Sequence, residues 1–369
     1  MRCRRNAPQR CVPSRWHSVI VFLVLVLFAK ELAVAQSALP THGWSFAVSG
    51  DSRNCGDVIM PAIAKEVRRE GAQFYWHLGD FRALTKYDED IIHAKGAQPL
   101  DIDDYQQLAW KDFIQREIMP FGPIPVYLGI GNHELVPPKT RLEYLVQFAD
   151  WIDTPGLKVQ RLQDDSSDHL LKTYYHWIHG GVDFINLDNA SHDEFDNEQL
   201  KWFEKVLGQA EQNADIKSVV VGMHAALPDS LAASHSMNDS AQGRESGRRA
   251  YADLLDFQGK TSKPVYILAS HSHFFMSNIF NTDELARRSE VLPGWIVGTA
   301  GAVRYRLPAD HTRADQALTD VYGFLVGHVS PSGKINFEFH RVNEQDVPED
   351  VTSRLGRNLV HDCFEGNRE

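Results

Sequence analysis

Short apolar runs with the length of buried strands recur along the chain, and this feature constrains the fold most. Each run is rich in β-branched or aromatic residues, and helical patterns lie between them. The early runs span residues 44–49, 74–78, 126–130, 182–187, 219–223 and 265–269. Strands that alternate with helices predict a layered α/β fold.

Two segments between the runs have the spacing and end signals of helices. One begins near Asp57 and stops at Gly71, and the other begins near Asn197 and stops at Gly208. Three further strands are expected at 295–297, 322–329 and 334–340, the last two joined by a Ser-Pro-Ser-Gly turn. Early helices and a strand-rich end predict a pair of sheets in the middle of the fold.

Two polar stretches look like insertions into this pattern. Residues 82–104 are acid-rich, and residues 228–249 are rich in Ser, Asn and Gly. A loop as long as the second is expected to be a lid or a binding loop. The end of the chain from Arg341 onward is charged and is expected to pack loosely, and residues 346–369 are set apart as a charged tail.

The first 35 residues have the anatomy of a secretory signal. Five arginines precede an apolar run at 19–29, and Ala33-Val34-Ala35 offers a small-x-small cleavage site. The apolar run is shorter than the roughly 20 residues that a membrane-spanning helix needs. We therefore expect a signal peptide at 1–35, a mature chain from about Gln36 with no membrane span, and a periplasmic or secreted location.

The charge and the cysteines narrow the choice of partner and compartment. Without residues 1–35, which carry six basic residues and one acidic residue, the formal net charge falls from −11 to −16. A chain this acidic lacks the excess of basic residues that is typical of a nucleic-acid-binding protein. Cys55 and Cys363 remain in the mature chain, and in an oxidising compartment they are either a pair or two separate thiols.

Potential metal ligands follow five of the early apolar runs. The motifs are Gly50-Asp51, Gly79-Asp80, Gly131-Asn132-His133-Glu134, Met223-His224 and Ser270-His271-Ser272-His273. Any one of these motifs alone is more often an ordinary turn or loop. Because the carboxyl ends of neighbouring strands meet at one edge of an open α/β sheet, the five motifs can converge on a single pocket.

The ordered set GD…GD…GNHE…MH…SHSH resembles the calcineurin-like metallophosphoesterase superfamily, which includes purple acid phosphatases and phosphodiesterases. The segments TYYHWIHGGVDFINLDNA and EQLKWFEKVL are similar to the strand pair and helix of that superfamily. The resemblance runs from about Trp44 to His340. It implies a metallophosphoesterase domain at 40–345 with a four-layer α/β/β/α sandwich, in which helices flank two mixed sheets.

The resemblance also implies the roles of individual residues. Asp80 would bridge two metal ions, with Asn132, His224 and His271 completing one site and Asp51 and His273 in the other. Zn, Mn and Fe all suit this set of nitrogen and oxygen ligands. His133 would contact the phosphate or protonate the leaving group, and Glu134 would orient the ring of His133.

The chain departs from the superfamily pattern in its first motif. Where many members have Asp-x-His, this chain has Asp51-Ser52-Arg53, and the tyrosine of purple acid phosphatases is replaced by Ala83. Three outcomes stay open: Arg53 clamps the substrate phosphate, another group fills the gap, or only one ion binds tightly. We favour the clamp, against an arginine turned outward to a surface carboxylate. Arg304 is a second candidate for contact with an anionic substrate.

The resulting prediction is an exported, metal-dependent hydrolase of small phosphoric esters, a phosphomonoesterase or a phosphodiesterase that uses a metal-activated water. The alternative is a catalytically impaired relative that binds metal or phosphorylated ligands. The presence of both Asp80 and His133 favours activity. His77 and Trp177 are expected to be core residues rather than parts of the site.

Overall fold

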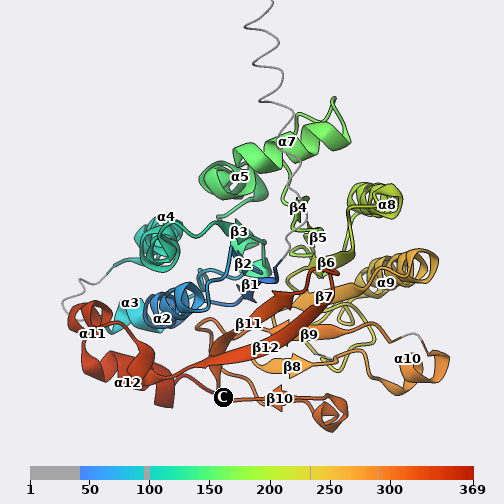
Figure 1. Cartoon of the computed structure of the whole chain (residues 1–369). Coiled ribbons are helices and arrows are strands. Elements are labelled where there is room, and N and C mark those ends of the chain that lie inside the picture. Colours follow the sequence, from blue (N-terminus) through green and yellow to red (C-terminus); the bar gives the residue numbers. More distant parts are fainter. Residues whose placement is uncertain (1–41, 95–99, 233, 290) are drawn as a thin grey trace, which may run out of the picture. The chain divides into compact units, whose positions relative to one another are not determined.

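Two β-sheets pack face to face between layers of helices in the computed structural model, which describes residues 42–94, 100–232, 234–289 and 291–369 (Figure 1). The signal peptide expected at 1–35 lies outside the described residues. The predicted α/β/β/α sandwich is confirmed. No helix among the described residues combines the length and the apolar character needed to cross a bilayer.

The first sheet has five strands in the order β12-β11-β1-β2-β3. Strands β1, β2 and β3 run parallel, and β11 and β12 are antiparallel additions to the β1 side. The strand bounds are β1 Trp44–Ser49, β2 Tyr75–His77, β3 Val126–Leu128, β11 Tyr322–Val329 and β12 Ile335–Val342. All residues of β1 are buried, which fits its apolar sequence and its place in the middle of the sheet.

The second sheet has seven strands in the order β10-β8-β9-β7-β6-β5-β4. Its central strands β5, β6, β7 and β9 run parallel, while β4, β8 and β10 pair antiparallel to their neighbours. The bounds are β4 Tyr175–His179, β5 Val182–Asn186, β6 Ser218–Gly222, β7 Val265–Ala269, β8 Phe275–Ser277, β9 Gly294–Val297 and β10 Ala317–Leu318.

Aromatic side chains fill the space between the two sheets. Phe46 and Trp76 of the five-stranded sheet meet Phe184 and Trp177 of the seven-stranded sheet, with ring centroids 4.9 Å and 5.1 Å apart. Such large buried rings contribute much of the apolar burial that stabilises a sandwich. Trp177 is thus a core residue, as predicted, and so is His77, which is fully buried.

Helices cover the outer faces of both sheets (Figure 1). On the seven-stranded sheet, α8 and α9 bury residues such as Phe203 and Leu254 in a second apolar cluster with Val219 and Val221. The helix bounds are α2 Gly56–Arg69, α3 Glu89–Ile92, α4 Ile102–Phe113, α5 Arg141–Gln147, α6 Ala149–Ile152, α7 Pro155–Asp164, α8 Asn197–Gln212, α9 Ala241–Thr261, α10 Asp283–Arg288, α11 Glu349–Leu355 and α12 Arg357–Glu365.

Two expectations about helices need correction. The cap of α8 is Asp196, whose side chain accepts from the backbone of Gln199, and the helix continues past Gly208 because Ala210 is buried against the core. That burial outweighs the cost of about 1 kcal/mol for a glycine inside a helix. The stretch 228–249 is only partly a loop, since α9 begins at Ala241 after the cap Ser240.

The charged C-terminal segment packs firmly, so the expectation of loose packing is wrong. Its helices α11 and α12 bury Val351, Leu355 and Leu359 in the main core. Cys363 of α12 forms a disulfide with Cys55, the residue before α2, across a sequence separation of 308 residues. The two cysteines that the sequence left open are therefore a pair.

Reduction of this disulfide is expected to lower the melting temperature. Removing a native disulfide typically costs about 2–5 kcal/mol of folding stability, and in the chain-entropy view the cost grows with the length of the closed loop. The measurement is thermal unfolding with and without dithiothreitol, with a Cys55→Ala/Cys363→Ala double variant as the matched control. The reductant should lower the transition of the native chain and leave that of the variant unchanged. An unchanged transition in a native chain with titratable free thiols would contradict the prediction.

A buried ion-pair triad joins β4 to β5 and to the end of α7. His176 Nε2 lies 2.6 Å from Asp164 Oδ2, and His176 Nδ1 lies 2.8 Å from Asp183 Oδ1. Burial lowers the pKa of His176, but the two carboxylates outweigh it and raise the pKa to about 10. The imidazolium therefore stabilises the folded chain fully below the unfolded pKa of about 6.5, and this contribution is lost as the pH rises towards 10.

The free energy of unfolding should therefore decrease from pH 6.5 to pH 10, by an amount on the order of a few kcal/mol from this residue. In a His176→Gln variant the decrease should be shallower, because glutamine has no proton to lose. Urea unfolding at pH 6.5 and pH 9.5 measures the difference. The exposed His169 supplies the control variant His169→Gln, and equal pH slopes in both variants would refute the role of His176.

Candidate metal centre

The potential ligands meet where the carboxyl ends of parallel strands from both sheets come together. This differs from the expected single sheet edge, because β1, β2 and β3 belong to one sheet and β6 and β7 to the other. Asp51 follows β1, Asp80 follows β2, Asn132 follows β3, His224 follows β6, and His271 and His273 follow β7. A contact of 3.1 Å between His224 Nδ1 and Leu78 O joins the two sheets at this point.

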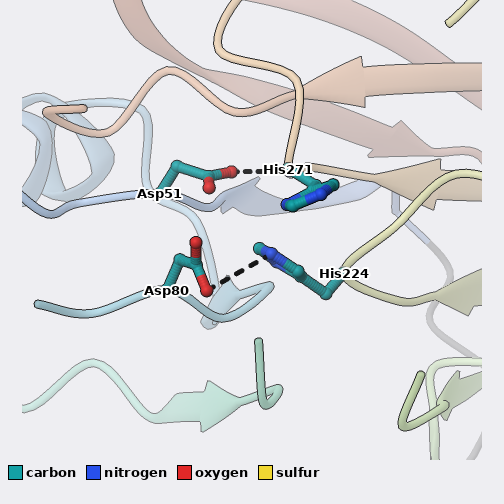
Figure 2. A group of neighbouring side chains, drawn as sticks. All are labelled: Asp51, Asp80, His224 and His271. Atoms are coloured by element: carbon teal, nitrogen blue, oxygen red, sulfur yellow. Dashed lines mark hydrogen bonds and ion pairs between the residues drawn. The ribbon is translucent and has the colours of Figure 1, made fainter. Parts of the chain in front are cut away.

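Four of these side chains form a tight cluster, shown in Figure 2. One ligand atom from each of Asp51, Asp80, His224 and His271 lies within 4.8 Å of those of the others. His224 Nε2 is 3.3 Å from Asp80 Oδ1 and 3.0 Å from Asn132 Oδ1, which adds Asn132 to the group. Asp51 Oδ2 accepts from the backbone N–H of His271 at 2.7 Å.

The backbone at the cluster adopts an unusual conformation. Asp51, Asp80 and His271 all have positive φ angles, of 60°, 60° and 65°. Residues other than glycine rarely adopt this left-handed region, and such strain gathers at functional sites. Gly131 is needed nearby, because a Cβ there would lie 2.3 Å from Asp80 Oδ1. The strained backbone conformation therefore accompanies the arrangement in which these side chains point toward one another.

The candidate ligand atoms of this cluster suit a bound cation. Among the described residues, Asp51 Oδ1, Asp80 Oδ2 and His271 Nδ1 are buried without a hydrogen-bond partner. Burial, followed by the nearby His224, lowers the pKa of His271 to about 3, so its ring offers a lone pair. Burial also lowers the pKa of His224, but Asp80 outweighs it and raises the pKa to about 9, so an ion beside Asp80 would take the place of a proton on this ring. Buried acceptors that lack donors are what an ion with nitrogen and oxygen ligands would satisfy.

Arg53 points into the site, which excludes the alternative of an arginine turned outward. Its Nη1 lies 2.7 Å from His133 Nε2 and its Nη2 lies 2.9 Å from His273 Nε2. Its Nε lies 3.6 Å from Asp80 Oδ2, and only 13% of the side chain is exposed. Burial lowers the pKa of Arg53, but Asp80 and Asp51 more than offset this and the net pKa is raised. His273 Nε2 therefore faces both Arg53 Nη2 and Asp51 Oδ1, and it lies 3.2 Å from the latter.

Glu134 anchors the backbone instead of orienting His133. Its carboxylate accepts from the backbone N–H groups of Asp80, Phe81 and Gly131, each at 2.8 Å. The ring of His133 is oriented by Ala83 O, 2.5 Å from His133 Nδ1. The predicted contact between Glu134 and the His133 ring is therefore wrong, and Glu134 acts on the loops that present Asp80 and Asn132.

Arg304 faces away from the centre, so its expected contact with substrate is not supported. It is buried, and its guanidinium donates to the backbone oxygens of Phe364 and Asn367 at 2.7 Å and 3.1 Å. It also lies over the ring of Tyr322. These contacts make Arg304 a structural link to the C-terminal segment.

The next residue, Tyr305, lies at the centre although no sequence motif pointed to it. Its ring stacks on that of His273 at 4.0 Å, and its hydroxyl is 3.5 Å from Arg53 Nη2. The ring of His235, from the stretch 228–249, lies 5.0 Å from Tyr305 and 5.4 Å from His271. Tyr305 and His235 thus line the approach to the ligands. A tyrosine in an irregular loop has no motif or periodicity that could have identified it.

A two-sheet sandwich with a carboxylate and imidazole cluster at its strand ends defines the metallophosphatase class. The model of the family described as calcineurin-like phosphoesterase matches residues 46–275. The chain belongs to this family of metal-dependent phosphoester hydrolases, as the sequence predicted.

Two solved structures are similar to this chain at low sequence identity. A dimetal phosphatase from Danio rerio is 12% identical with a TM-score of 0.51, covering 81% of this chain and 96% of the other. A structure of PhoD is 14% identical with a TM-score of 0.49, covering 88% of this chain and 77% of the other. No curated protein matches the sequence. At 12% identity, the similarity to the dimetal phosphatase concerns the fold alone.

Proposed function

We propose that the chain is an exported enzyme that hydrolyses small phosphoric esters, either monoesters or diesters, at a metal centre. Family membership supports the class of reaction. The observation that carries the proposal is the convergence of buried acceptor atoms of Asp51, Asp80 and His271 that have no donor in the described part of the chain.

The ligands proposed for an ion are Asp80, Asn132, His224 and His271, with Asp51 beside them. Carboxylate, carboxamide and imidazole groups suit Zn, Mn or Fe. When bound, such an ion lowers the pKa of a water molecule and polarises a phosphoryl oxygen. The protein's own contribution is to fix the ligands in a buried, preorganised arrangement.

Arg53 and His133 are proposed to act on the phosphate as a pair. His133 Nε2 accepts a hydrogen bond from Arg53 Nη1, so in this arrangement it has no proton to donate to a leaving group. A phosphate oxygen that accepts from Arg53 instead would free the lone pair of His133 Nε2, which could then bind a proton and donate it to the ester oxygen of the leaving group. Substrate binding and the role of His133 are therefore coupled through Arg53.

Export is proposed from the leader at 1–35 and from the disulfide. A disulfide between Cys55 and Cys363 suits the periplasm or the extracellular space, where thiols are oxidised. Mass spectrometry of the protein isolated from the producing cells tests this proposal. A chain that begins near Gln36 is expected, and an intact leader in a cytosolic fraction would contradict it.

The activity itself is tested on two substrates, an aryl phosphate and a bis-aryl phosphate. The purified protein is stripped with a chelator and then supplied separately with Zn²⁺, Mn²⁺ or Fe²⁺. Hydrolysis that disappears with the chelator and returns with metal is expected, and the preferred substrate distinguishes a monoesterase from a diesterase. Metal binding without hydrolysis of either substrate would favour the alternative of a catalytically impaired binding protein.

A further inference from the structure

The guanidinium of Arg53 occupies a position enclosed by three groups that the family resemblance connects with metal binding or catalysis. It contacts His273 and His133 by hydrogen bonds and Asp80 by an ion pair. In the described part of the chain, its side chain makes one further hydrogen bond, to the hydroxyl of Tyr305. Arg53 is thus a cation placed among ligands, and the described residues show no hydrogen bond or ion pair between it and Asn132, His224 or His271.

The tautomers of the two histidines leave no free lone pair at this position. His273 Nδ1 lies 2.7 Å from Val303 O, and His133 Nδ1 lies 2.5 Å from Ala83 O. Since a carbonyl oxygen can only accept, each Nδ1 bears the proton and each Nε2 bears the lone pair. Both lone pairs accept from Arg53, so neither is free for a metal ion while the guanidinium is in place.

Electrostatics leads to the same result. Asp80 Oδ2 lies 3.6 Å from Arg53 Nε, so this carboxylate already faces a positive charge, and Asp51 Oδ1 lies 3.2 Å from Nε2 of the neutral His273 ring. A dication in the same space would lie about 4 Å or less from the guanidinium, where like charges repel strongly in a buried site. One cation can occupy this space, and in this chain that cation is Arg53.

We infer that Arg53 takes the place of one of two metal ions, so that the centre binds a single ion per chain, at Asp80, Asn132, His224 and His271. This inference rests on the proposed function only in that the cluster binds a metal. The guanidinium supplies one positive charge and a planar set of N–H donors that match phosphate oxygens. Arg53 thereby combines charge compensation for Asp51 and Asp80 with recognition of the substrate phosphate.

The test is the number of Mn²⁺ ions bound per chain, measured by isothermal titration of the chelator-stripped full chain and by metal analysis after gel filtration. The described residues contain one other cluster that could hold a metal, formed by His328, Glu338 and His340 on β11 and β12. All measurements are therefore made in a His328→Ala background. The variants compared are Arg53→His, which replaces the cation by a neutral nitrogen ligand, and Arg53→Lys, which retains the cation.

One ion per chain is expected with arginine or lysine at position 53, and two with histidine. The electron paramagnetic resonance spectrum gives a second readout, because two Mn²⁺ ions about 3.5–4 Å apart couple magnetically. An isolated-ion signal is expected from the chain with Arg53 and a coupled-pair signal from Arg53→His. Two ions in the chain with Arg53 would overturn the inference, and so would a single ion in a folded Arg53→His variant.

The outcomes separate the inference from the proposed function. Hydrolysis with two ions bound in the chain with Arg53 would overturn the inference and leave the proposed function standing. One bound ion without hydrolysis would overturn the proposed function and leave the inference standing. No bound ion would overturn both. If Arg53→His does not fold, as judged by circular dichroism, the count and the spectrum of the chain with Arg53 still decide the question.

Discussion

Replacing His224 with alanine is expected to abolish metal retention and to lower hydrolysis by at least about a hundredfold. The reason is geometric. His224 Nε2 lies 3.0 Å from Asn132 Oδ1 and 3.3 Å from Asp80 Oδ1, and it is the candidate nitrogen ligand beside these two oxygen ligands. Even groups that only support a metal ligand typically change affinity or activity by 10–100-fold when removed, so the loss of a ligand should cost about a hundredfold or more.

The measurements are metal content after dialysis and turnover of the better phosphate ester. The matched control is His235→Ala, because the His235 ring lies 5.4 Å from that of His271 but outside the ligand cluster. This control should retain its metal. Thermal unfolding of both variants separates loss of a ligand from loss of the fold. Full metal content and full turnover in a folded His224→Ala variant would contradict the ligand assignment.

Replacing Arg82 with methionine is expected to destabilise the fold severely. Arg82 is fully buried and forms ion pairs with a group of acidic side chains from several elements. Its Nη2 lies 2.6 Å from Asp57 Oδ1 and 3.1 Å from Glu117 Oε1, and its Nη1 lies 3.2 Å from Asp90 Oδ1. Asp88 and Asp112 also contact it. Without Arg82, these carboxylates would lie buried with insufficient positive charge.

Removing one partner of a buried ion pair costs about 3–5 kcal/mol, a large part of the 5–15 kcal/mol that stabilises a typical domain. Burial raises the pKa values of Asp90 and Glu117 well above the usual range even with Arg82 present. Protonation therefore favours the folded state, and that contribution is lost as the pH rises. The Arg82→Met variant should accordingly be least stable at neutral and alkaline pH and should recover as the pH falls towards about 4–5.

Urea unfolding across this pH range tests the prediction. The control is Arg248→Met, which removes a largely exposed arginine paired with Asp229 at 2.7 Å and should cost about 1 kcal/mol or less. A loss of stability in Arg82→Met as small as that in the control would contradict the role of Arg82. Because Arg82 lies two residues after Asp80, a partly folded variant is also expected to bind metal more weakly.

Much of the fold follows from local sequence patterns, because buried strands need uninterrupted apolar runs. The expected bounds 44–49, 265–269 and 322–329 are those of β1, β7 and β11. The ends of helices were less predictable. The helix α8 passes Gly208, since burial of residues beyond it depends on contacts with the seven-stranded sheet that no local pattern encodes.

The positions of the candidate ligands could be predicted because each one follows an apolar strand. The direction in which each arginine side chain points could not be predicted from the sequence. Arg53 and Arg304 both stand in irregular segments after a strand, yet the first points at His133 and His273 and the second at the C-terminal backbone. These directions depend on tertiary contacts, among them the helix α12 that accepts from Arg304. The disulfide of Cys363 depends on the same tertiary packing.

The most direct test of the metal centre is a crystal structure of the protein soaked in Mn²⁺, with anomalous scattering used to locate the ion. The expected result is one strong peak about 2.0–2.3 Å from the oxygen and nitrogen ligands of Asp80, Asn132, His224 and His271. No peak within reach of these side chains, in crystals that bind Mn²⁺ elsewhere on the chain, would contradict the assignment of the site.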